Sequence, residues 1–454
     1  MDTFLIEGGR RLEGSLRVFG SKNAALPEMC AALLTNQPVT LRDVPNLADI
    51  RSLRNLLGEL GCIGEYAALA GGSGGGGQAV MRLHTQDESL EKSHARYEIV
   101  RTMRASISTL GPMLARRGFA RVSMPGGCSI GDRPVDLHLR GLAALGAEIT
   151  LDGGDITARA PKKGLKGATI FLGGQFGSTV LGTANVMCAA TLAKGTTVIE
   201  SAACEPEIVD LAVMLTKMGA KISGHGSPRL VIEGVDELKG VDHTVMADRI
   251  EAGTFMLAAA ITNGDLTLEN CPIDAMLAVK DKLLAMGIHL AVTPGANNDL
   301  LRATVRVTSA RTLKPVEFTT QPHPGFPTDI QAQMMATLTL ADGNSVITER
   351  IFPERFLHVA ELSRMGAKLM RQGATVIVSG VKKLVGAPVM ASDLRASAGL
   401  VLAGLAAEGT TIINRVYHLD RGYEKMEDRL AKLGASIRRV DDKDLPSHLT
   451  GGGD

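Results

Sequence analysis

"MGAKI", residues 218–222, stands where one apolar stretch ends and another begins, and the chain repeats this segment with small changes. The glycines of the six copies are 68 to 85 residues apart. Because glycine readily adopts the left-handed conformation that ends a helix, each copy predicts a helix that stops at the glycine and is followed by a strand. The other copies are "LGCI" at 60–63, "LGAEI" at 145–149, "MGIHL" at 286–290, "MGAKL" at 365–369 and "LGASI" at 433–437.

A second shared pattern lies upstream of most copies: an apolar, alanine-rich stretch, a short polar turn and a run of β-branched residues. Each repeat therefore reads as helix, glycine turn, strand, second helix, glycine and strand, and we expect six such α/β repeats. Chance recurrence of a common helix ending is the alternative, and six copies at this spacing argue against it. Examples of the upstream pattern are "CAATLAKGTTVIES" at 188–201, "LAAAITNGDLTLEN" at 257–270 and "LAGLAAEGTTIINR" at 402–415.

The length of 454 residues exceeds what one hydrophobic core usually serves, which favours two domains. Three repeats precede residue 247 and three follow it. We expect a first domain at 22–247, a second at 1–21 plus 248–445, and a flexible tail at 446–454. The Gly/Ser-rich stretch at 68–80, with its glycine-rich part at 70–77, predicts a flexible, peripheral excursion.

The composition is typical of a globular protein, with 45% hydrophobic and 21% charged residues. A net charge of +1 and an aromatic content of 3% argue against nucleic acid or an anionic membrane surface as a partner. The six cysteines include no CxxC pair, since the closest two, Cys188 and Cys204, are 16 positions apart. The N-terminus lacks the apolar core of a signal peptide, and the apolar stretches are too short to span a bilayer. We expect a reduced, cytoplasmic protein without membrane insertion.

Charged residues gather at the predicted starts of the first helices of the repeats. A helix N-terminus offers unpaired N–H groups and the positive end of the helix dipole, which suits phosphate or carboxylate. With Arg133 and Arg421, these positions predict a site for a polyanionic substrate. For each residue alone a helix cap or a surface charge is the alternative, and Asp248 with Glu251 fits a capping box, as Asp393 fits a cap. The residues are Lys22, Asn23, Arg104, Asp248, Arg249, Glu251, Asp329, Asp393 and Arg395.

Cys128 lies in "MPGGCSIGDRPVDLH" at 124–138, where glycines and prolines predict a loop. The nearby Arg133 would make the surroundings electropositive, a setting that activates thiols. The residues alone leave a chemical role and an inert thiol both open, and proton transfer remains open beside covalent catalysis. His138 fits no clear role as a base. The cysteines that instead read as buried hydrophobic residues are Cys30, Cys188 and Cys271.

Several long segments carry a family resemblance, among them "GSKNAALP", "PGGC.IG.RPVDLH", "EPEIVDLA", "DRIEAGTF", "FPTDIQAQ", "ERFLHVAELSRMGA", "DLRASAGLVLAG" and "YHLDRGYE". In order from about residue 3 to residue 440, the chain resembles the UDP-N-acetylglucosamine 1-carboxyvinyltransferases, a family of enolpyruvyl transferases. The resemblance implies an inside-out α/β barrel of two domains, each with three βαβαββ units. It also implies transfer of the enolpyruvyl group of phosphoenolpyruvate to the 3′-hydroxyl of UDP-N-acetylglucosamine, with release of phosphate. This reaction is the first committed step of peptidoglycan synthesis, and no metal or other cofactor is implied.

The same resemblance assigns roles position by position. Cys128 matches the loop cysteine that protonates C3 of phosphoenolpyruvate and that fosfomycin alkylates, and Asp329 matches the carboxylate proposed to take the proton of the sugar hydroxyl. Lys22, Arg133 and Arg421 match cations at the phosphate of phosphoenolpyruvate, and Lys22 and Arg421 also count as catalytic. Arg395 matches a cation at its carboxylate, and Asn23 matches a residue that touches both substrates. The nucleotide-sugar positions are Arg104, Arg133, Pro134, Val135, Asp136, Leu137, Ser178, Thr179, Val180 and Ile351.

The reaction implied by the resemblance is an addition followed by an elimination, through a tetrahedral intermediate that carries the phosphate. It needs an acid, a base and fixed cations. Because the matching residues come from both halves of the chain, we expect the site between the two domains, with the Cys128 loop as a closing lid.

Two features depart from the family pattern. Gly177 occupies a position where many relatives carry a basic residue near the nucleotide pyrophosphate, and the insert at 70–77 is longer than a short turn. Three other functions fit the sequence less well. The sister enzyme that acts on shikimate 3-phosphate lacks the Cys128 loop motif, and a non-catalytic paralogue that binds the nucleotide-sugar would need neither Cys128 nor Asp329. A structural repeat scaffold does not explain charges at helix starts.

Overall fold

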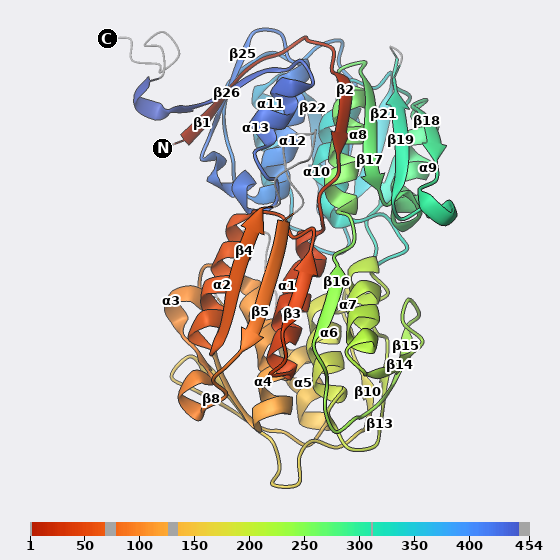
Figure 1. The fold of residues 1–454 in the computed structure, drawn as a ribbon. Coiled ribbons are helices and arrows are strands. Elements are labelled where there is room, and N and C mark those ends of the chain that lie inside the picture. Colours follow the sequence, from red (N-terminus) through yellow and green to blue (C-terminus); the bar gives the residue numbers. More distant parts are fainter. Residues whose placement is uncertain (1, 69–78, 126–134, 310–311, 445–454) are drawn as a thin grey trace. The chain divides into compact units, whose positions relative to one another are not determined.

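The computed structural model describes residues 2–68, 79–125, 135–309 and 312–444 (Figure 1). Cys128, Arg133, Pro134, the insert at 70–77 and the tail at 446–454 therefore lie outside the described residues. The chain divides into two units. One contains the described residues up to Val18 and from Ala247 onward, and the other contains those from Phe19 to Met246. Within the described part of the chain, no helix is long and apolar enough to cross a lipid bilayer.

Three four-stranded sheets of one topology form the unit of residues 19–246. In each sheet the first two strands named here are parallel, and the following pairs are antiparallel. The orders are β16 (Val241–Thr244), β3 (Val39–Arg42), β5 (Ala79–Thr85), β4 (Cys62–Ala68); β6 (His94–Ala95), β7 (Phe119–Ser123), β9 (Asp155–Arg159), β8 (Glu148–Asp152); and β10 (Thr169–Phe171), β13 (Thr196–Glu200), β15 (Arg229–Glu233), β14 (Lys221–Ser223).

Two helical segments accompany each of these sheets, so that the chain runs strand, helix, strand, helix, strand, strand. The opening strand of the first sheet, β16, comes from the far end of the unit, and Val241 pairs with Val39. A small hairpin of β11 (Gly173–Gly174) and β12 (Gly177–Ser178) precedes the third repeat's first helix. The helices are α1 (Lys22–Ala31) and α2 (Ala48–Glu59); η3 (Arg104–Thr109), α4 (Leu110–Arg117) and α5 (Asp136–Ala144); and α6 (Val180–Ala190) and α7 (Pro206–Lys217), with a short α3 (Tyr97–Val100).

The second unit repeats this plan three times, and its N-terminal segment contributes one strand to each of two sheets. The sheets are β2 (Glu13–Arg17), β17 (Asp265–Cys271), β19 (Ala303–Thr308), β18 (His289–Thr293); β20 (Glu317–Thr319), β21 (Asn344–Thr348), β23 (Thr375–Ser379), β22 (Lys368–Gln372); and β24 (Pro388–Met390), β25 (Thr410–Asn414), β1 (Asp2–Glu7), β26 (Ser436–Asp441). The helices are α8 (Arg249–Ile261), α9 (Leu277–Ala285), α10 (Gln331–Leu338), α11 (Leu357–Arg364), α12 (Leu394–Ala406) and α13 (Met426–Lys432).

The repeated glycine predicted from "MGAKI" ends the second helix of every repeat. All six glycines have positive φ, from 81° to 108°. This is the left-handed region, where a side chain is disfavoured, so glycine is the residue that lets the chain leave the helix and enter the next strand. The prediction of six α/β repeats is confirmed. The glycines are Gly61, Gly146, Gly219, Gly287, Gly366 and Gly434.

The first helix of each repeat lies in the interior of its unit. Every residue of α8 is buried, and α8, α10 and α12 contact one another. In the other unit α6 contacts α1 and α4. A helix that is apolar on all sides is stable only when it is enclosed, whereas the strands bury alternate residues and turn the others outward. The first helices of the repeats therefore form the core of each unit, as the inside-out fold class predicts, whereas second helices such as α9 and α11 bury only two residues each.

Candidate active site

Lys22 is the first residue of α1, and its position is fixed by a cap and an ion pair. The hydroxyl of Ser21 accepts a hydrogen bond from the Ala24 N–H at 3.3 Å and so caps the helix. The Lys22 Nζ lies 3.3 Å from the Asp49 Oδ2, and both side chains are about one-tenth exposed or less. A nearly buried ammonium held at a helix N-terminus is suited to bind an anion. Asn23 follows it and is half-buried.

Asn185 of α6 joins the segments that carry most of the predicted nucleotide-sugar positions of this unit. Its Nδ2 donates to the Ile107 carbonyl at 3.0 Å and lies 3.0 Å from the His138 Nδ1, and its Oδ1 accepts from the Gly111 N–H at 2.6 Å. A Cβ on Gly111 would lie only 2.2 Å from the Asn185 carbonyl oxygen, so glycine is required there. These bonds tie together η3, α4, α5 and α6. His138, left without a role by sequence reasoning, is a buried partner of Asn185.

The helical segments that Asn185 ties together begin with residues predicted to bind the nucleotide-sugar. Arg104 opens η3, Asp136 and Leu137 open α5, and Val180 opens α6. The Thr179 hydroxyl accepts from the Gly182 N–H at 3.2 Å and caps α6, and Ser178 precedes it on β12. Val135, just before α5, is buried. The structure thus places these helix starts on one hydrogen-bonded frame.

Gly177 has a structural reason to be glycine. Its φ is 98°, in the left-handed region, so a basic residue at this position would have a strained backbone. A basic group does lie at the same hairpin, because the Arg140 Nη2 donates to the Gly173 carbonyl at 3.0 Å and its side chain is otherwise exposed. Sequence reasoning missed Arg140, whose position on α5 carries no signal of its proximity to β11.

Asp329 lies in η6 (Thr328–Ile330), directly before α10, and two guanidinium groups bind its carboxylate. The Arg355 Nη1 donates to Oδ1 at 2.9 Å, and the Arg395 Nη2 donates to Oδ2 at 3.0 Å. Both arginine side chains are buried, while Asp329 is 27% exposed. Burial lowers the pKa of Arg395, but the negative charge of Asp329 and other neighbours outweighs it and holds the pKa above its usual value. The carboxylate is therefore rigidly held yet open to a ligand.

Arg355 was not among the residues singled out from the sequence. Besides Asp329, its Nη1 donates to the Thr328 hydroxyl at 3.1 Å, and its Nη2 lies 3.8 Å from the Asp393 Oδ1. Asp393 itself accepts from the backbone N–H groups of Arg395 and Ala396 at 2.9 and 3.2 Å, which confirms it as a helix cap. Asp248 caps α8 in the same way. An arginine that precedes a helix has no local pattern that reveals such partners.

A buried carboxylate holds the segment that carries Ile351. The Glu349 Oε1 accepts from the Thr320 hydroxyl at 2.6 Å and from the Ile351 and Phe352 N–H groups at 2.9 and 3.0 Å. Its Oε2 accepts from the Thr328 hydroxyl at 2.9 Å. Because Thr328 adjoins Asp329, this side chain fixes Ile351 relative to the Asp329 carboxylate.

A polar network fixes Arg395 from its other side. The Arg395 Cζ lies 5.5 Å from the centre of the Tyr423 ring. The Tyr423 hydroxyl lies 2.9 Å from the Thr254 Oγ1 and accepts from the Gln333 Nε2 at 3.1 Å, and Gln333 also donates to the Asp329 carbonyl. Arg421 ends η7 (Val416–Arg421) on the adjoining segment and is half-buried.

The comparison with known protein families decides the classification. The model of the EPSP synthase (3-phosphoshikimate 1-carboxyvinyltransferase) family matches residues 6–430. The chain belongs to this family. It is 52% identical over 439 residues to "UDP-N-acetylglucosamine 1-carboxyvinyltransferase" of Anaeromyxobacter sp. (strain Fw109-5), and the match covers 97% of this chain and 99% of the relative. It is 49% identical over 440 residues to the protein of the same name from Methylacidiphilum infernorum (isolate V4), with the same coverage.

A solved structure of an enolpyruvyl transferase shares the fold. NikO from Streptomyces tendae superposes with a TM-score of 0.84 at 25% identity, and the match covers 97% of this chain and 99% of that one. Together with the two relatives, this structural match identifies the chain as a carboxyvinyltransferase of the EPSP synthase family. The predicted family and fold are confirmed.

Proposed function

We propose that this transferase moves the enolpyruvyl group of phosphoenolpyruvate to the 3′-hydroxyl of UDP-N-acetylglucosamine and releases phosphate. This would be the first committed step of peptidoglycan synthesis and would take place in the cytoplasm. The observation that carries the proposal is the 52% identity to a relative of that name across 99% of the relative. The buried cations at Lys22 and around Asp329 support it, because two anionic substrates require fixed positive charge.

Phosphoenolpyruvate would be held through its two anionic groups. Lys22, Arg133 and Arg421 would bind the phosphate and Arg395 the carboxylate, with Asn23 touching both substrates. A guanidinium can bind a carboxylate through two parallel hydrogen bonds, whereas Lys22 is a compact point charge at a helix N-terminus. The pair that Lys22 forms with Asp49 holds the ammonium in place before the phosphate arrives.

Asp329 would act on the hydroxyl of the sugar. With both oxygens accepting from guanidinium groups it is a weak base, because those bonds stabilise its negative charge. If Arg395 turns to the carboxylate of phosphoenolpyruvate, Oδ2 loses that donor and can accept the hydroxyl proton. Binding of one substrate would thus activate the base for the other.

The bond changes then follow in two steps. Cys128, outside the described residues, would donate a proton to C3 of phosphoenolpyruvate while the 3′-oxygen bonds to C2, which gives a tetrahedral intermediate that keeps the phosphate. In the second step the Cys128 thiolate would take a proton back from C3 while phosphate leaves C2, which restores the double bond and the thiol. Proton transfer by a positioned acid and base contributes about a hundredfold to ten-thousandfold each. Alkylation of the same thiol would account for inhibition by fosfomycin.

UDP-N-acetylglucosamine would lie on the frame held by Asn185. Arg104, the segment 133–137 and the segment 178–180 would contact it, and Ile351 and Asp329 are further proposed contacts. Arg140, at the hairpin that contains Gly177, would supply the basic group that Gly177 does not provide.

Phosphate release tests this function directly. The enzyme would be incubated with phosphoenolpyruvate and either UDP-N-acetylglucosamine or shikimate 3-phosphate, each with and without fosfomycin. We expect release only with the nucleotide-sugar, and loss of that release with fosfomycin. Release with shikimate 3-phosphate would identify the sister activity, and tight nucleotide-sugar binding without any release would indicate a regulatory paralogue.

A further inference from the structure

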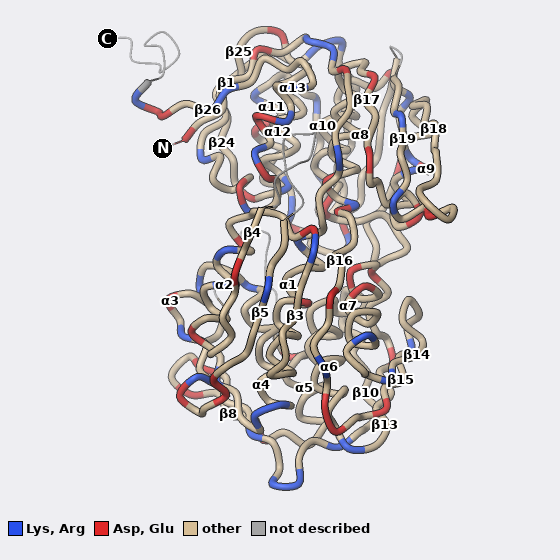
Figure 2. The backbone as a smooth tube through the Cα atoms, viewed as in Figure 1, with Lys and Arg blue, Asp and Glu red and all other residues tan. Residues whose placement is uncertain are grey.

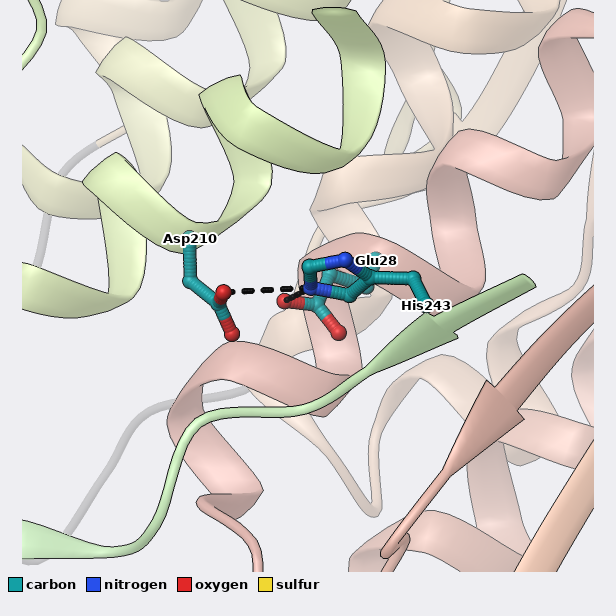
Figure 3. A group of neighbouring side chains, drawn as sticks. All are labelled: Glu28, Asp210 and His243. Carbon is teal, nitrogen blue, oxygen red and sulfur yellow. Dashed lines mark hydrogen bonds and ion pairs between the residues drawn. The ribbon is translucent and has the colours of Figure 1, made fainter. Parts of the chain in front are cut away.

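Three titratable side chains outside the proposed substrate site converge in the unit of residues 19–246. Glu28 comes from α1, Asp210 from α7 and His243 from β16, and Figure 3 shows their polar ends turned toward one another. One donor atom of each lies within 4.8 Å of the others. Glu28 is fully buried and His243 is almost so. Two carboxyl groups this close in the interior need either a cation or a shared proton.

The contacts of His243 decide in favour of a proton. Its Nδ1 lies 3.1 Å from the Lys217 Nζ, and its Nε2 lies 3.1 Å from the Asp210 Oδ1 and 3.7 Å from the Glu28 Oε1. An ammonium can only donate, so Nδ1 accepts and the ring proton is on Nε2, where it is donated to Asp210. In this tautomer Nε2 has no lone pair for a metal ion.

With Lys217 positive, Asp210 negative and His243 neutral, the charges of the cluster balance if Glu28 is neutral. Neither of its oxygens has a donor among the described residues. Burial, and then the charge of Asp210, raise the pKa of Glu28 well above its usual value. Burial also acts to raise the pKa of Asp210, but the hydrogen bonds that it accepts, first from His243 and then from Glu28 and the Met246 N–H, outweigh burial, and the pKa of Asp210 is lowered. Asp210 is thus the carboxylate and Glu28 the acid that can donate to it.

A chain of hydrogen bonds leads from this cluster to Lys22. The Asp210 Oδ2 accepts from the Met246 N–H at 2.7 Å. The Met246 carbonyl accepts from the Ser21 N–H at 2.7 Å, and Ser21 caps the helix that begins at Lys22. Glu28 lies on the same helix, six residues further along. The cluster therefore holds α1 at two points, its start and its middle.

We propose that Asp210 is a positioning residue for Lys22, and that Glu28, as a neutral acid, keeps Asp210 in place by sharing its proton. This inference rests on the proposed function, in which Lys22 binds the phosphate of phosphoenolpyruvate. Loss of the shared proton at alkaline pH would set two carboxylates against each other and pull Asp210 from Met246. The affinity for phosphoenolpyruvate would then fall, while nucleotide-sugar binding would not.

Glu28 faces a small set of charged groups. These are Asp210 and Lys217 of α7 and His243 of β16. On the other elements packed against α1, Asp49 of α2 pairs with Lys22 and Cys188 of α6 lies near Cys30.

Kinetics of three variants across pH test the proposal. Asp210→Asn removes one acceptor and the charge, and we expect KM for phosphoenolpyruvate to rise about tenfold with KM for UDP-N-acetylglucosamine changed by less than about twofold. Glu28→Gln keeps a neutral donor, so it should match the parent at neutral pH and lose the alkaline rise in KM. Glu233→Gln, an exposed carboxylate on β15 of the same unit, is the control and should change neither constant.

Hydrogen exchange of the full chain gives a readout that does not depend on turnover. We expect the amides of residues 19–24 and 245–247 to exchange about tenfold faster in Asp210→Asn than in the parent. Unchanged exchange there, or an unchanged KM for phosphoenolpyruvate, would overturn the proposal. Stoichiometric zinc or manganese in the purified parent, removed by a chelator with faster exchange in these segments, would also overturn it. A parent that releases no phosphate would refute the proposed function, and the exchange result would still decide the role of Asp210.

Discussion

Replacing Asn185 with leucine tests whether the hydrogen-bonded frame positions the nucleotide-sugar. Leucine has nearly the same shape, so the change creates little cavity and removes the contacts to Ile107, Gly111 and His138. A backbone N–H, a carbonyl and a ring nitrogen would then be buried without their partner. At about 1 kcal/mol for each bond, we expect a loss of about 3 kcal/mol in the free energy of unfolding. For a unit of this size that corresponds to about 6–12 °C in Tm.

The assay compares both substrates. Because Asn185 ties η3, α5 and α6 together, KM for UDP-N-acetylglucosamine should rise about tenfold, with a much smaller rise for phosphoenolpyruvate. Thr191→Val is the matched control, since the Thr191 hydroxyl donates only to the Cys188 carbonyl of its own helix. It should cost less than about 1 kcal/mol and leave both KM values unchanged. A destabilised Asn185→Leu enzyme with an unchanged KM for the nucleotide-sugar would refute the positioning argument.

Three further predictions concern Arg355, His358 and the buried thiols. Arg355→Lys keeps the charge but has one nitrogen, so it cannot contact Asp329 and Thr328 from the place of Nη1 and Asp393 from the place of Nη2 at the same time. We expect kcat/KM to fall at least about tenfold in the phosphate assay, and parent-like activity would exclude Arg355 from the site. Burial lowers the pKa of His358 to about 4, so the neutral side chain contributes fully to the free energy of unfolding above pH 6.5, and about 3 kcal/mol is lost as the pH falls to 4. In urea titrations the free energy of unfolding of His358→Asn should fall less steeply below pH 6.5 than that of the parent. An equal fall would contradict this. Burial raises the pKa of the Cys188 and Cys271 thiols to about 12, so neither should react with a thiol reagent at pH 8 until the chain unfolds, as mass spectrometry of labelled peptides would show.

The repeated architecture could be predicted from the sequence because its signals are local. The glycine at each helix end has a conformational requirement that does not depend on distant residues, and Gly219 and its five counterparts fulfil it. The pairing of β1 with β25 has no such signal, because the register Thr3↔Asn414 joins opposite ends of the chain. Similarly, helix caps such as Asp248 and Asp393 were predicted correctly from their immediate neighbours.

Residues of the candidate site could be predicted only where a motif marks them. Asp329 and Arg395 lie in recognisable segments, and the structure brings them within 3.0 Å of each other. Arg355 and Asn185 act through partners that are distant in sequence, and neither residue type nor spacing reveals those partners. The cluster of Glu28, Asp210 and His243 also combines three separate elements, so only the folded chain shows it.

The measurement that tests the central claim most directly is identification of the product. Isotope-labelled phosphoenolpyruvate would be incubated with the enzyme, UDP-N-acetylglucosamine and shikimate 3-phosphate, and both acceptors would be analysed by mass spectrometry and NMR. We predict an enolpyruvyl ether at the 3′-oxygen, with one phosphate released for each product formed. A nucleotide-sugar recovered unchanged, or a label carried by shikimate 3-phosphate instead, would contradict the account.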